Sequence, residues 1–466
     1  MNERTIMVDL AGIGLGPFNL SLAALADGVK GLSSAFFERR ASVAWHAGLT
    51  FSDAVLQTSP LKDLVTPVCP TSPWSFLNYL VENGRFFDFM AARFDTVSRQ
   101  EFSDYLAWAA DGLGSTHLDA GVEEADFVDG QFRLRFANRP DCFCRAVAVG
   151  TGHEPMVPPS VTTGPDCFHA SQYLAIKPNI AGRRIAVIGG GQSGAEIVLH
   201  LLQQDYDRSP ASLSWFSRRD GFWTLQEGGL VDQFFTPDYL AAYRTMAPDL
   251  QARALASQKF ASDGLTPSTA DGIYRLLYQR RHLHGRHDVS LFPGREVVRV
   301  QSSGHGRTVV SETANGERET SQADLVILAT GYRPAIPSCL DPLAERLALE
   351  PDGALALGDR YRALWDGPDA NPIYGLNQGR RSYGVIDPQL SMAAWRSAVI
   401  LNDFAGHRVY DLGETEERPM VAWQRQAGDT GWQPRMNGSV TSTDSQLTAW
   451  PAHGPSRRRP QSAALS

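Results

Sequence analysis

Two glycine-rich turns are the features of this sequence whose residue types and spacing point most directly to chemistry. The first turn contains Gly12, Gly14 and Gly16; it follows the apolar run Met7–Ala11 and precedes the helix-like stretch Asn19–Ala26. In such a strand–turn–helix unit, one glycine permits the tight turn and another lets the backbone approach a pyrophosphate at the helix N-terminus. We therefore expect the first turn to bind a dinucleotide.

Pro17 and Glu38 strengthen this prediction. Pro17 takes the place of the third glycine and suits the first turn of a helix, where a missing N–H is no loss. The next strand candidate, Ser34–Phe37, ends at Glu38, 26 residues after Gly12 (38 − 12 = 26). A carboxylate at this place can accept hydrogen bonds from the hydroxyls of a ribose.

The second turn has the full G-x-G-x-x-G spacing. Gly189, Gly191 and Gly194 lie between the apolar run Arg184–Ile188 and the helix-like stretch Ala195–Gln203. This pattern also predicts a dinucleotide site.

The strand after the second turn ends in a hydroxyl and two guanidinium groups, those of Ser217, Arg218 and Arg219. An NAD site places an acid here, whereas these groups fit the additional 2′-phosphate of NADP. The alternative is a solvent-exposed turn whose arginines bind nothing.

Because different residues follow the two turns, we expect two nucleotides with different requirements. FAD at the first turn and NADPH at the second is the simplest assignment, and it makes the chain a flavin-dependent oxidoreductase. The five cysteines include no C-x-x-C pair, which excludes a dithiol reductase, and their spacing predicts no metal site. Hydride transfer to a small acceptor and activation of O2 remain open.

The order of strand and helix patterns predicts an α/β fold with two Rossmann-like dinucleotide-binding domains and a small helical substrate region. We expect the first part of the FAD-binding domain over residues 1–175. An NADPH-binding domain is expected over 176–320, with the helical substrate region near 225–285. The second part of the FAD-binding domain is expected over 321–415, and a late helix within it over Pro388–Phe404.

Composition excludes several other classes of protein. The 466 residues include 43 Lys+Arg and 51 Asp+Glu, a net charge of −8 that offers no footprint for nucleic acid. No stretch reaches 18 apolar residues, so no membrane span is predicted, and we expect a cytoplasmic protein. Residues 427–466 are rich in Gly, Pro, Ser, Thr and Arg without an apolar period, which predicts a disordered tail.

Five motifs together resemble the flavin-dependent N-hydroxylating monooxygenases of siderophore biosynthesis: GIGLGPFNLSLAAL, LQTSPLKDLVTP, RQEFSDYLAWAA, GGGQSGAE and ATGYRP. The resemblance runs from about Met7 to Gln424. It points to the lysine N6-hydroxylase branch, which includes relatives acting on putrescine or cadaverine, such as the alcaligin biosynthesis monooxygenase. It implies that NADPH reduces FAD, that O2 reacts with the reduced flavin, and that a small primary amine becomes a hydroxylamine. It also implies a homo-oligomer, often a tetramer.

The resemblance also implies roles for single residues. Those expected beside the flavin are Trp45, His46, Gln57 and Leu390. Those expected at NADPH are Gly191, Gln192, Ser193 and Arg219. Those expected at the substrate are Lys62 and Ser391. No side chain is assigned as catalytic, because the flavin carries the chemistry.

Two acids bear on which amine is bound. Asp232 and, by a looser alignment, Asp263 stand where the ornithine branch carries asparagines. Carboxylates there favour the second ammonium of a diamine over an amino-acid carboxylate, whereas the Lys62 ammonium favours a carboxylate. The substrate therefore stays open between a diamine (putrescine or cadaverine) and L-lysine. The alternatives are L-ornithine, a flavin monooxygenase of a ketone or sulfide, and a non-catalytic nucleotide-binding redox sensor.

Overall fold

The computed structural model describes residues 5–94, 96–304, 306–413 and 420–423. The tail predicted over 427–466 lies outside the described residues.

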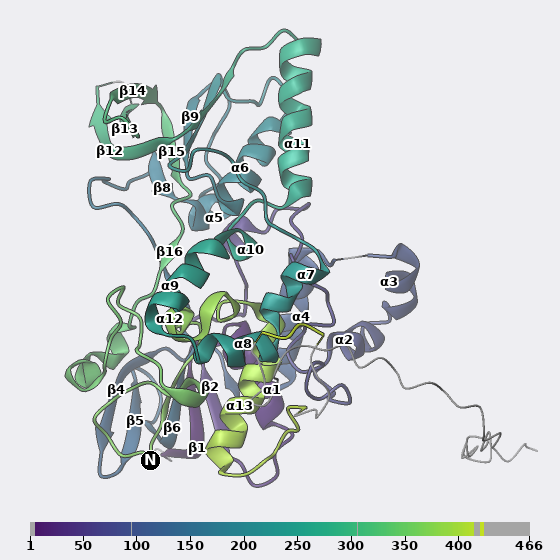
Figure 1. Cartoon of the computed structure of the whole chain (residues 1–466), viewed down its shortest axis with the longest axis vertical. Helices are drawn as coiled ribbons and strands as arrows, with labels where there is room; N and C mark the ends of the chain where they lie inside the picture. Colours follow the sequence, from purple (N-terminus) through teal and green to yellow (C-terminus); the bar gives the residue numbers. More distant parts are fainter. Residues whose placement is uncertain (1–4, 95, 305, 414–419, 424–466) are drawn as a thin grey trace, which may run out of the picture. The chain divides into compact units, whose positions relative to one another are not determined.

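The first glycine turn follows one strand of a seven-stranded sheet (Figure 1). The order of the sheet is β3-β2-β1-β6-β5-β4, and β17 also pairs with β6. The strands are β1 (Ile6–Ile13), β2 (Ser34–Phe37), β3 (Thr116–His117), β4 (Val122–Val128), β5 (Gln131–Phe136), β6 (Cys142–Val149) and β17 (Ile373–Gly375). The pairs that involve β1, β2, β3 and β17 are parallel, whereas β4, β5 and β6 pair antiparallel. A late segment of the chain thus completes a sheet that begins at its start.

Helices from both ends of the chain pack beside this sheet. Helix α1 (Pro17–Ala26) lies against α13 (Ala393–Ala405), as Figure 1 shows. The other helices of this part are α2 (Phe76–Glu82), α3 (Phe86–Ala92) and α4 (Arg99–Gly112). The late helix expected from Pro388 begins five residues later, at Ala393 (393 − 388 = 5). Gln389 is extended (φ −85°, ψ 130°), and a 3₁₀ turn over Leu390–Met392 separates it from the helix.

The second sheet consists of five parallel strands in the order β11-β10-β9-β15-β8. They are β8 (Cys167–His169), β9 (Arg184–Ile188), β10 (Ser212–Ser217), β11 (Val289–Pro293) and β15 (Leu325–Leu328). Every residue of β15 is buried, as expected for a parallel strand covered on both faces.

Two strands of the second sheet lie outside the range expected for the second domain. Residues 176–320 leave out β8 and β15, yet both strands pair within the second sheet. Both are short runs of buried residues, and β15 joins them to β9 by parallel ladders. The single sequence carries no signal for that pairing, because β8 and β15 are far apart along the chain.

Two small sheets and a group of helices complete the described residues. Strands β12 (Arg295–Ser303), β13 (Gly306–Thr313) and β14 (Arg318–Ala323) form an antiparallel sheet, and β7 (Glu154–Pro155) pairs with β16 (Tyr332–Arg333). Helices α5 (Tyr173–Ile176) and α6 (Gln192–Leu202) belong to the second part, where α6 packs against α11 (Pro267–Tyr278). The remaining helices are α7 (Gly229–Asp232), α8 (Pro237–Arg244), α9 (Pro248–Ser257), α10 (Lys259–Ser262) and α12 (Arg380–Tyr383). Within the described residues, no helix combines the length and apolar character needed to cross a membrane.

Candidate functional site

The first glycine turn joins β1 to α1 under tight steric constraint. Gly14 has φ +82°, and a Cβ there would lie 2.8 Å from the carbonyl oxygen of Gly150. A Cβ on Gly12 would lie 2.1 Å from a ring carbon of Phe36, so this buried glycine permits close strand packing. Gly16 precedes α1, and Pro17 occupies the first helical turn, as its ring favours.

Asn19 stabilises this turn by hydrogen bonds from its side-chain amide. Its role was not predicted from the sequence. Its buried Nδ2 donates to the carbonyl oxygens of Gly14 at 2.7 Å and Ile13 at 3.2 Å. It also reaches Ala148 O on β6 at 3.3 Å. One amide thus ties the turn to two strands, and the sequence signal was its place at the start of the expected helix.

Glu38 lies at the end of β2, as expected, and its carboxylate is held by several donors. Leu15 N donates to Oε2 at 3.0 Å, while Arg40 donates to Oε1 from Nε at 2.9 Å and from its backbone N at 3.1 Å. Burial alone would raise the pKa of Glu38, but these hydrogen bonds and the charge of Arg40 hold it below its usual value. The ionised carboxylate keeps further lone pairs for hydroxyl donors.

A cavity of about 610 Å³ opens beside this turn. The expected flavin-binding residues that line it are Gly14, Gly16, Pro17, Glu38, Trp45 and His46. Its wall also includes Asn377, whose buried Oδ1 has no hydrogen-bond partner in the described part of the chain. A cavity of this size, edged by a glycine turn, an acid and an unpaired amide oxygen, fits a bound dinucleotide.

Trp45 and His46 meet edge to face, with ring centroids 4.6 Å apart. His46 lines the cavity and keeps contact with solvent there, while many protein atoms lie close to its ring. Burial among these atoms, with a smaller contribution from the charge of Arg99, lowers the pKa of His46 to about 4. At neutral pH the cavity wall therefore carries a neutral imidazole.

Three glycines of the second turn are required by contacts within the protein. A Cβ on Gly189, whose φ is +128°, would lie 2.0 Å from Ala329 O, and one on Gly194 would lie 2.2 Å from Gly189 O. Gly190, which was not among the expected site residues, would meet Ser217 Oγ at 2.4 Å.

Gly191 differs, because a Cβ there would meet no protein atom within 4 Å. It precedes α6, so free space adjoins the N-terminal turn of a helix whose first N–H groups lack intrahelical acceptors. This geometry fits a pyrophosphate.

Gln192 and Ser193 follow Gly191 at the start of α6. The Gln192 amide turns toward protein partners: Nε2 donates to Glu196 at 3.0 Å, and Oε1 accepts from Thr266 N at 2.8 Å. The hydroxyl of the half-buried Ser193 has no hydrogen-bond partner among the described residues.

The three residues after β10 have different surroundings. Ser217 is buried and its hydroxyl donates to Gly221 O at 3.3 Å. Arg218 is largely exposed and lies 3.5 Å from a carboxylate oxygen of Glu296. Arg219 donates from Nη1 to the carbonyl oxygen of Asp263 at 2.7 Å. Of the three residues, Arg219 is therefore the one whose side chain contacts the helical region expected near 225–285.

Lys62 immediately precedes a turn that the Asp63 carboxylate organises. The Asp63 carboxylate accepts from Val65 N at 2.9 Å, Thr66 N at 2.6 Å and Phe76 N at 2.7 Å. Burial raises the pKa of Asp63 against these hydrogen bonds. The half-buried Lys62 has no ion-pair partner in the described part of the chain.

The other expected substrate and flavin residues lie on several elements. Asp232 ends α7 and is exposed without an ion pair to another described residue. Asp263 is different, because its carboxylate is bound by Arg380 Nη2 at 2.7 Å. The remaining residues do not line the cavity: Gln57, which is exposed, and Leu390 and Ser391, which are half-buried in a 3₁₀ turn.

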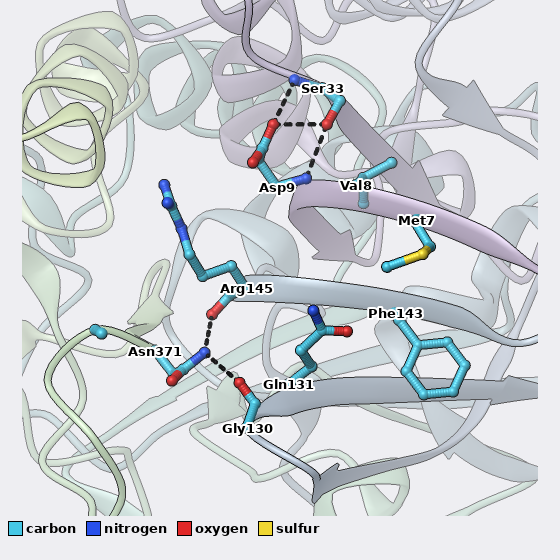
Figure 2. A pocket seen from close by; sticks show the side chains of 10 residues that line it. Met7, Val8, Asp9, Ser33, Gly130, Gln131, Phe143, Arg145 and Asn371 are labelled. Carbon is cyan, nitrogen blue, oxygen red and sulfur yellow. Dashed lines mark hydrogen bonds between the residues drawn. The ribbon is translucent and has the colours of Figure 1, made fainter.

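A second depression, of about 410 Å³, contains none of the expected site residues (Figure 2). Its wall includes the start of β1, whereas dinucleotide sites lie at the carboxyl ends of parallel strands. Asp9 accepts hydrogen bonds from Ser33, and Asn371 donates to the carbonyl oxygens of Gly130 and Arg145. Its polar groups thus largely satisfy one another. Among the described residues, no group of three His, Cys, Asp or Glu side chains is arranged to hold a metal ion.

Comparison with known proteins finds similar enzymes. The L-lysine N6-monooxygenase of Escherichia coli is 39% identical over 410 residues, which cover 87% of this chain and 96% of that protein. The putrescine N-hydroxylase of Acinetobacter baumannii is 31% identical over 439 residues, or 92% and 96% of the two chains.

Solved structures are similar over most of the chain. The FAD-bound cadaverine monooxygenase DfoA of Erwinia amylovora has a TM-score of 0.83 and 28% identity, covering 91% of this chain and all of that one. The ornithine N-hydroxylase KtzI of Kutzneria sp. 744, with reduced FAD, NADP+ and L-ornithine, has a TM-score of 0.79, 27% identity and coverages of 86% and 99%. Residues 6–334 match the family described as L-lysine 6-monooxygenase/L-ornithine 5-monooxygenase. The chain belongs to this family of monooxygenases.

Proposed function

We propose that the chain is an FAD- and NADPH-dependent monooxygenase that uses O2 to N-hydroxylate the terminal primary amine of L-lysine or of a diamine (putrescine or cadaverine), for the synthesis of a hydroxamate siderophore. The observation that carries the proposal is the contrast between the two glycine turns. The Glu38 carboxylate follows the first turn, and the Arg219 guanidinium follows the second. Relatives that act on lysine, putrescine and cadaverine support an amine substrate.

We assign FAD to the first sheet and NADPH to the second. Glu38 would accept the ribose hydroxyls of FAD, and the turn at Gly14 and Gly16 would face its pyrophosphate. Gly191 and the start of α6 would receive the pyrophosphate of NADPH, with Arg219 at its 2′-phosphate. When bound, FAD reduced by NADPH supplies the activated oxygen.

The chain itself must present the amine in its neutral form. An alkylammonium has a pKa of about 10.4, so neutralising it near pH 7.4 costs about 4 kcal/mol. Exclusion of water from the amine lowers that cost, because burial disfavours the charged form. The neutral His46 imidazole adds no charge to the wall of the cavity.

We place L-lysine before the diamines. Lys62 offers a half-buried ammonium without a partner among the described residues, which suits the α-carboxylate of an amino acid. Asp263 was one of two acids that favoured a diamine, but Arg380 already compensates its charge. Asp232 stays available to bind the α-ammonium of L-lysine.

We also propose a cytoplasmic homo-oligomer, with a tetramer as the assembly that the family resemblance suggests. Sedimentation velocity on the FAD-loaded protein tests the assembly, and a monomer at micromolar concentration would contradict it.

An amine panel tests the proposed reaction. Purified FAD-loaded protein is incubated with NADPH, O2 and L-lysine, L-ornithine, putrescine or cadaverine, and hydroxylamine formation is compared with NADPH oxidation. We expect coupled product formation, with the highest kcat/KM for L-lysine. Highest kcat/KM for a diamine would reverse the order of substrates. Absence of hydroxylamine with all four amines would overturn the proposal, and a ketone or sulfide product would identify the other flavin monooxygenase.

A further inference from the structure

Three positively charged side chains gather around Asp263, beside the strand end that carries Arg219. Arg219 Nη1 donates to the Asp263 carbonyl oxygen at 2.7 Å. Arg380 Nη2 lies 2.7 Å from Asp263 Oδ2. Lys259 is one helical turn before Asp263, whose backbone N donates to Lys259 O at 2.8 Å. The cluster therefore draws on β10, α10 and α12.

The cluster has more positive charge than its own acid can balance. Arg219, Arg380 and Lys259 bring three positive charges near the single carboxylate of Asp263, which pairs with Arg380. Lys259 has no ion-pair partner among the described residues. Burial, followed by the charges of Arg219 and of the other neighbouring arginines, lowers the pKa of Lys259 below its usual value. This uncompensated charge is suited to an anion.

The position of the cluster indicates which anion. Arg219 follows β10, the second strand of the unit that begins at β9, and this strand end is where a Rossmann fold receives the 2′ position of the adenosine ribose. The Arg219 guanidinium also lies 5.4 Å from the centre of the Phe260 ring, which keeps it next to Lys259. Arg218, by contrast, points to Glu296 and is largely exposed.

We propose that Lys259 and Arg380 join Arg219 in binding the 2′-phosphate of NADPH, and that Asp263 holds Arg380 in place until the phosphate replaces it. The proposal rests on the proposed function only in taking NADPH as the coenzyme. It changes the role of Asp263 from a substrate contact to a counter-ion within the coenzyme site. It also makes Arg380, from the late part of the chain, a determinant of coenzyme specificity.

Binding of 2′,5′-ADP and of 5′-ADP to the FAD-loaded protein, measured by calorimetry, tests the proposal without turnover. We expect Arg380→Gln to weaken 2′,5′-ADP binding by about tenfold, and Lys259→Gln by about threefold, with 5′-ADP binding unchanged. Arg381→Gln is the matched control for Arg380, since its partner Asp352, at 3.3 Å, lies outside the cluster. Arg253→Gln is the control for Lys259, because Arg253 is exposed beside Asp249.

Equal 2′,5′-ADP affinity in Arg380→Gln, Lys259→Gln and wild type would overturn the proposal. An equal loss of affinity for 2′,5′-ADP and for 5′-ADP would also overturn the proposal, because the lost contact would then not be one with the 2′-phosphate. Lys259 is exposed, so its variant keeps the test valid if Arg380→Gln folds poorly.

Asp263→Asn separates the two roles of Asp263. If Asp263 is a counter-ion, replacing it with asparagine frees Arg380 and removes a negative charge. We then expect 2′,5′-ADP to bind several-fold more tightly and the KM for the amine to stay unchanged. A raised amine KM with unchanged 2′,5′-ADP affinity would restore the substrate role and overturn the proposal. Failure of the proposed function would instead appear as wild-type protein that binds 2′,5′-ADP normally but hydroxylates no amine.

Discussion

Arg99 and Glu196 form a two-bond ion pair that connects the start of α4 with α6. Nη2 of Arg99 lies 2.7 Å from Oε1 of Glu196, and Nη1 lies 3.0 Å from Oε2. Both side chains are largely buried, and Arg99 Nη1 also donates to Leu49 O at 2.7 Å. Glu196 in turn accepts from Gln192, in the first turn of α6. A residue near the first sheet therefore helps to place the turn that is proposed to receive NADPH.

Glu196→Gln is expected to destabilise the fold and to weaken coenzyme binding. The substitution leaves the Arg99 guanidinium with an uncompensated charge, at a cost of about 2 kcal/mol in the free energy of unfolding. It also replaces the charged acceptor of the Gln192 amide by a neutral one, which weakens that hydrogen bond, so the KM for NADPH is expected to rise. Urea denaturation and steady-state kinetics measure the two effects.

Glu124→Gln is the control, because the Glu124–Arg135 pair is exposed. Its cost is expected to stay below about 1 kcal/mol. Equal effects of the two substitutions would mean that the Arg99–Glu196 pair contributes no more than a surface pair.

Local patterns predicted the strands that flank the two glycine turns, because the residues that decide these units are neighbours in sequence. β2 and β9 have the bounds that their apolar runs indicate. Contacts between segments that are far apart in sequence produced no local pattern from which they could be predicted. Arg99 and Glu196 are 97 residues apart, and Arg380 and Asp263 are 117 apart. The pairing of β8 with β15 likewise could not be predicted from local patterns. The charge balance at Asp263 could not be judged without knowing that Arg380 is its partner.

Alanine substitutions at two adjacent glycines are expected to affect different properties, stability at Gly190 and NADPH binding at Gly191. Gly190→Ala places a Cβ 2.4 Å from Ser217 Oγ, in a buried contact, so it should lower the free energy of unfolding by about 2 kcal/mol. Gly191→Ala meets no protein atom within 4 Å and has φ −103°, so stability should change by less than about 1 kcal/mol. The added methyl group enters the space assigned to the pyrophosphate and should raise the NADPH KM at least several-fold.

Thermal melts and NADPH titrations distinguish the two variants. If Gly191→Ala bound NADPH as tightly as wild type, the open space beside α6 would not be the pyrophosphate site. If Gly190→Ala melted at the wild-type temperature, Ser217 would have to move more easily than its burial suggests.

Lys62→Met tests the amino-acid substrate directly. Loss of the ammonium should raise the KM for L-lysine by about tenfold or more, because a charge-assisted contact to its α-carboxylate is removed. Putrescine and cadaverine lack that carboxylate, so their KM should change little. The control is Lys30→Met, at an exposed position. A uniform rise in KM for lysine and both diamines would show that Lys62 does not recognise the carboxylate.

The low pKa of His46, about 4, predicts a pH-dependent contribution to stability. An unfolded histidine has a pKa of about 6.5, so between pH 6.5 and 4 the unfolded chain binds a proton at this residue that the folded chain does not. The contribution is therefore fully present above pH 6.5 and is lost as the pH falls toward 4. His46→Asn removes the titrating ring, and asparagine tolerates the φ of +51° found at this position. Urea denaturation of the FAD-loaded protein at pH 7.5 and pH 5 should show a smaller loss of unfolding free energy in the variant than in wild type. Equal losses in the two proteins would mean that the imidazole at the cavity wall titrates as it does in the unfolded chain.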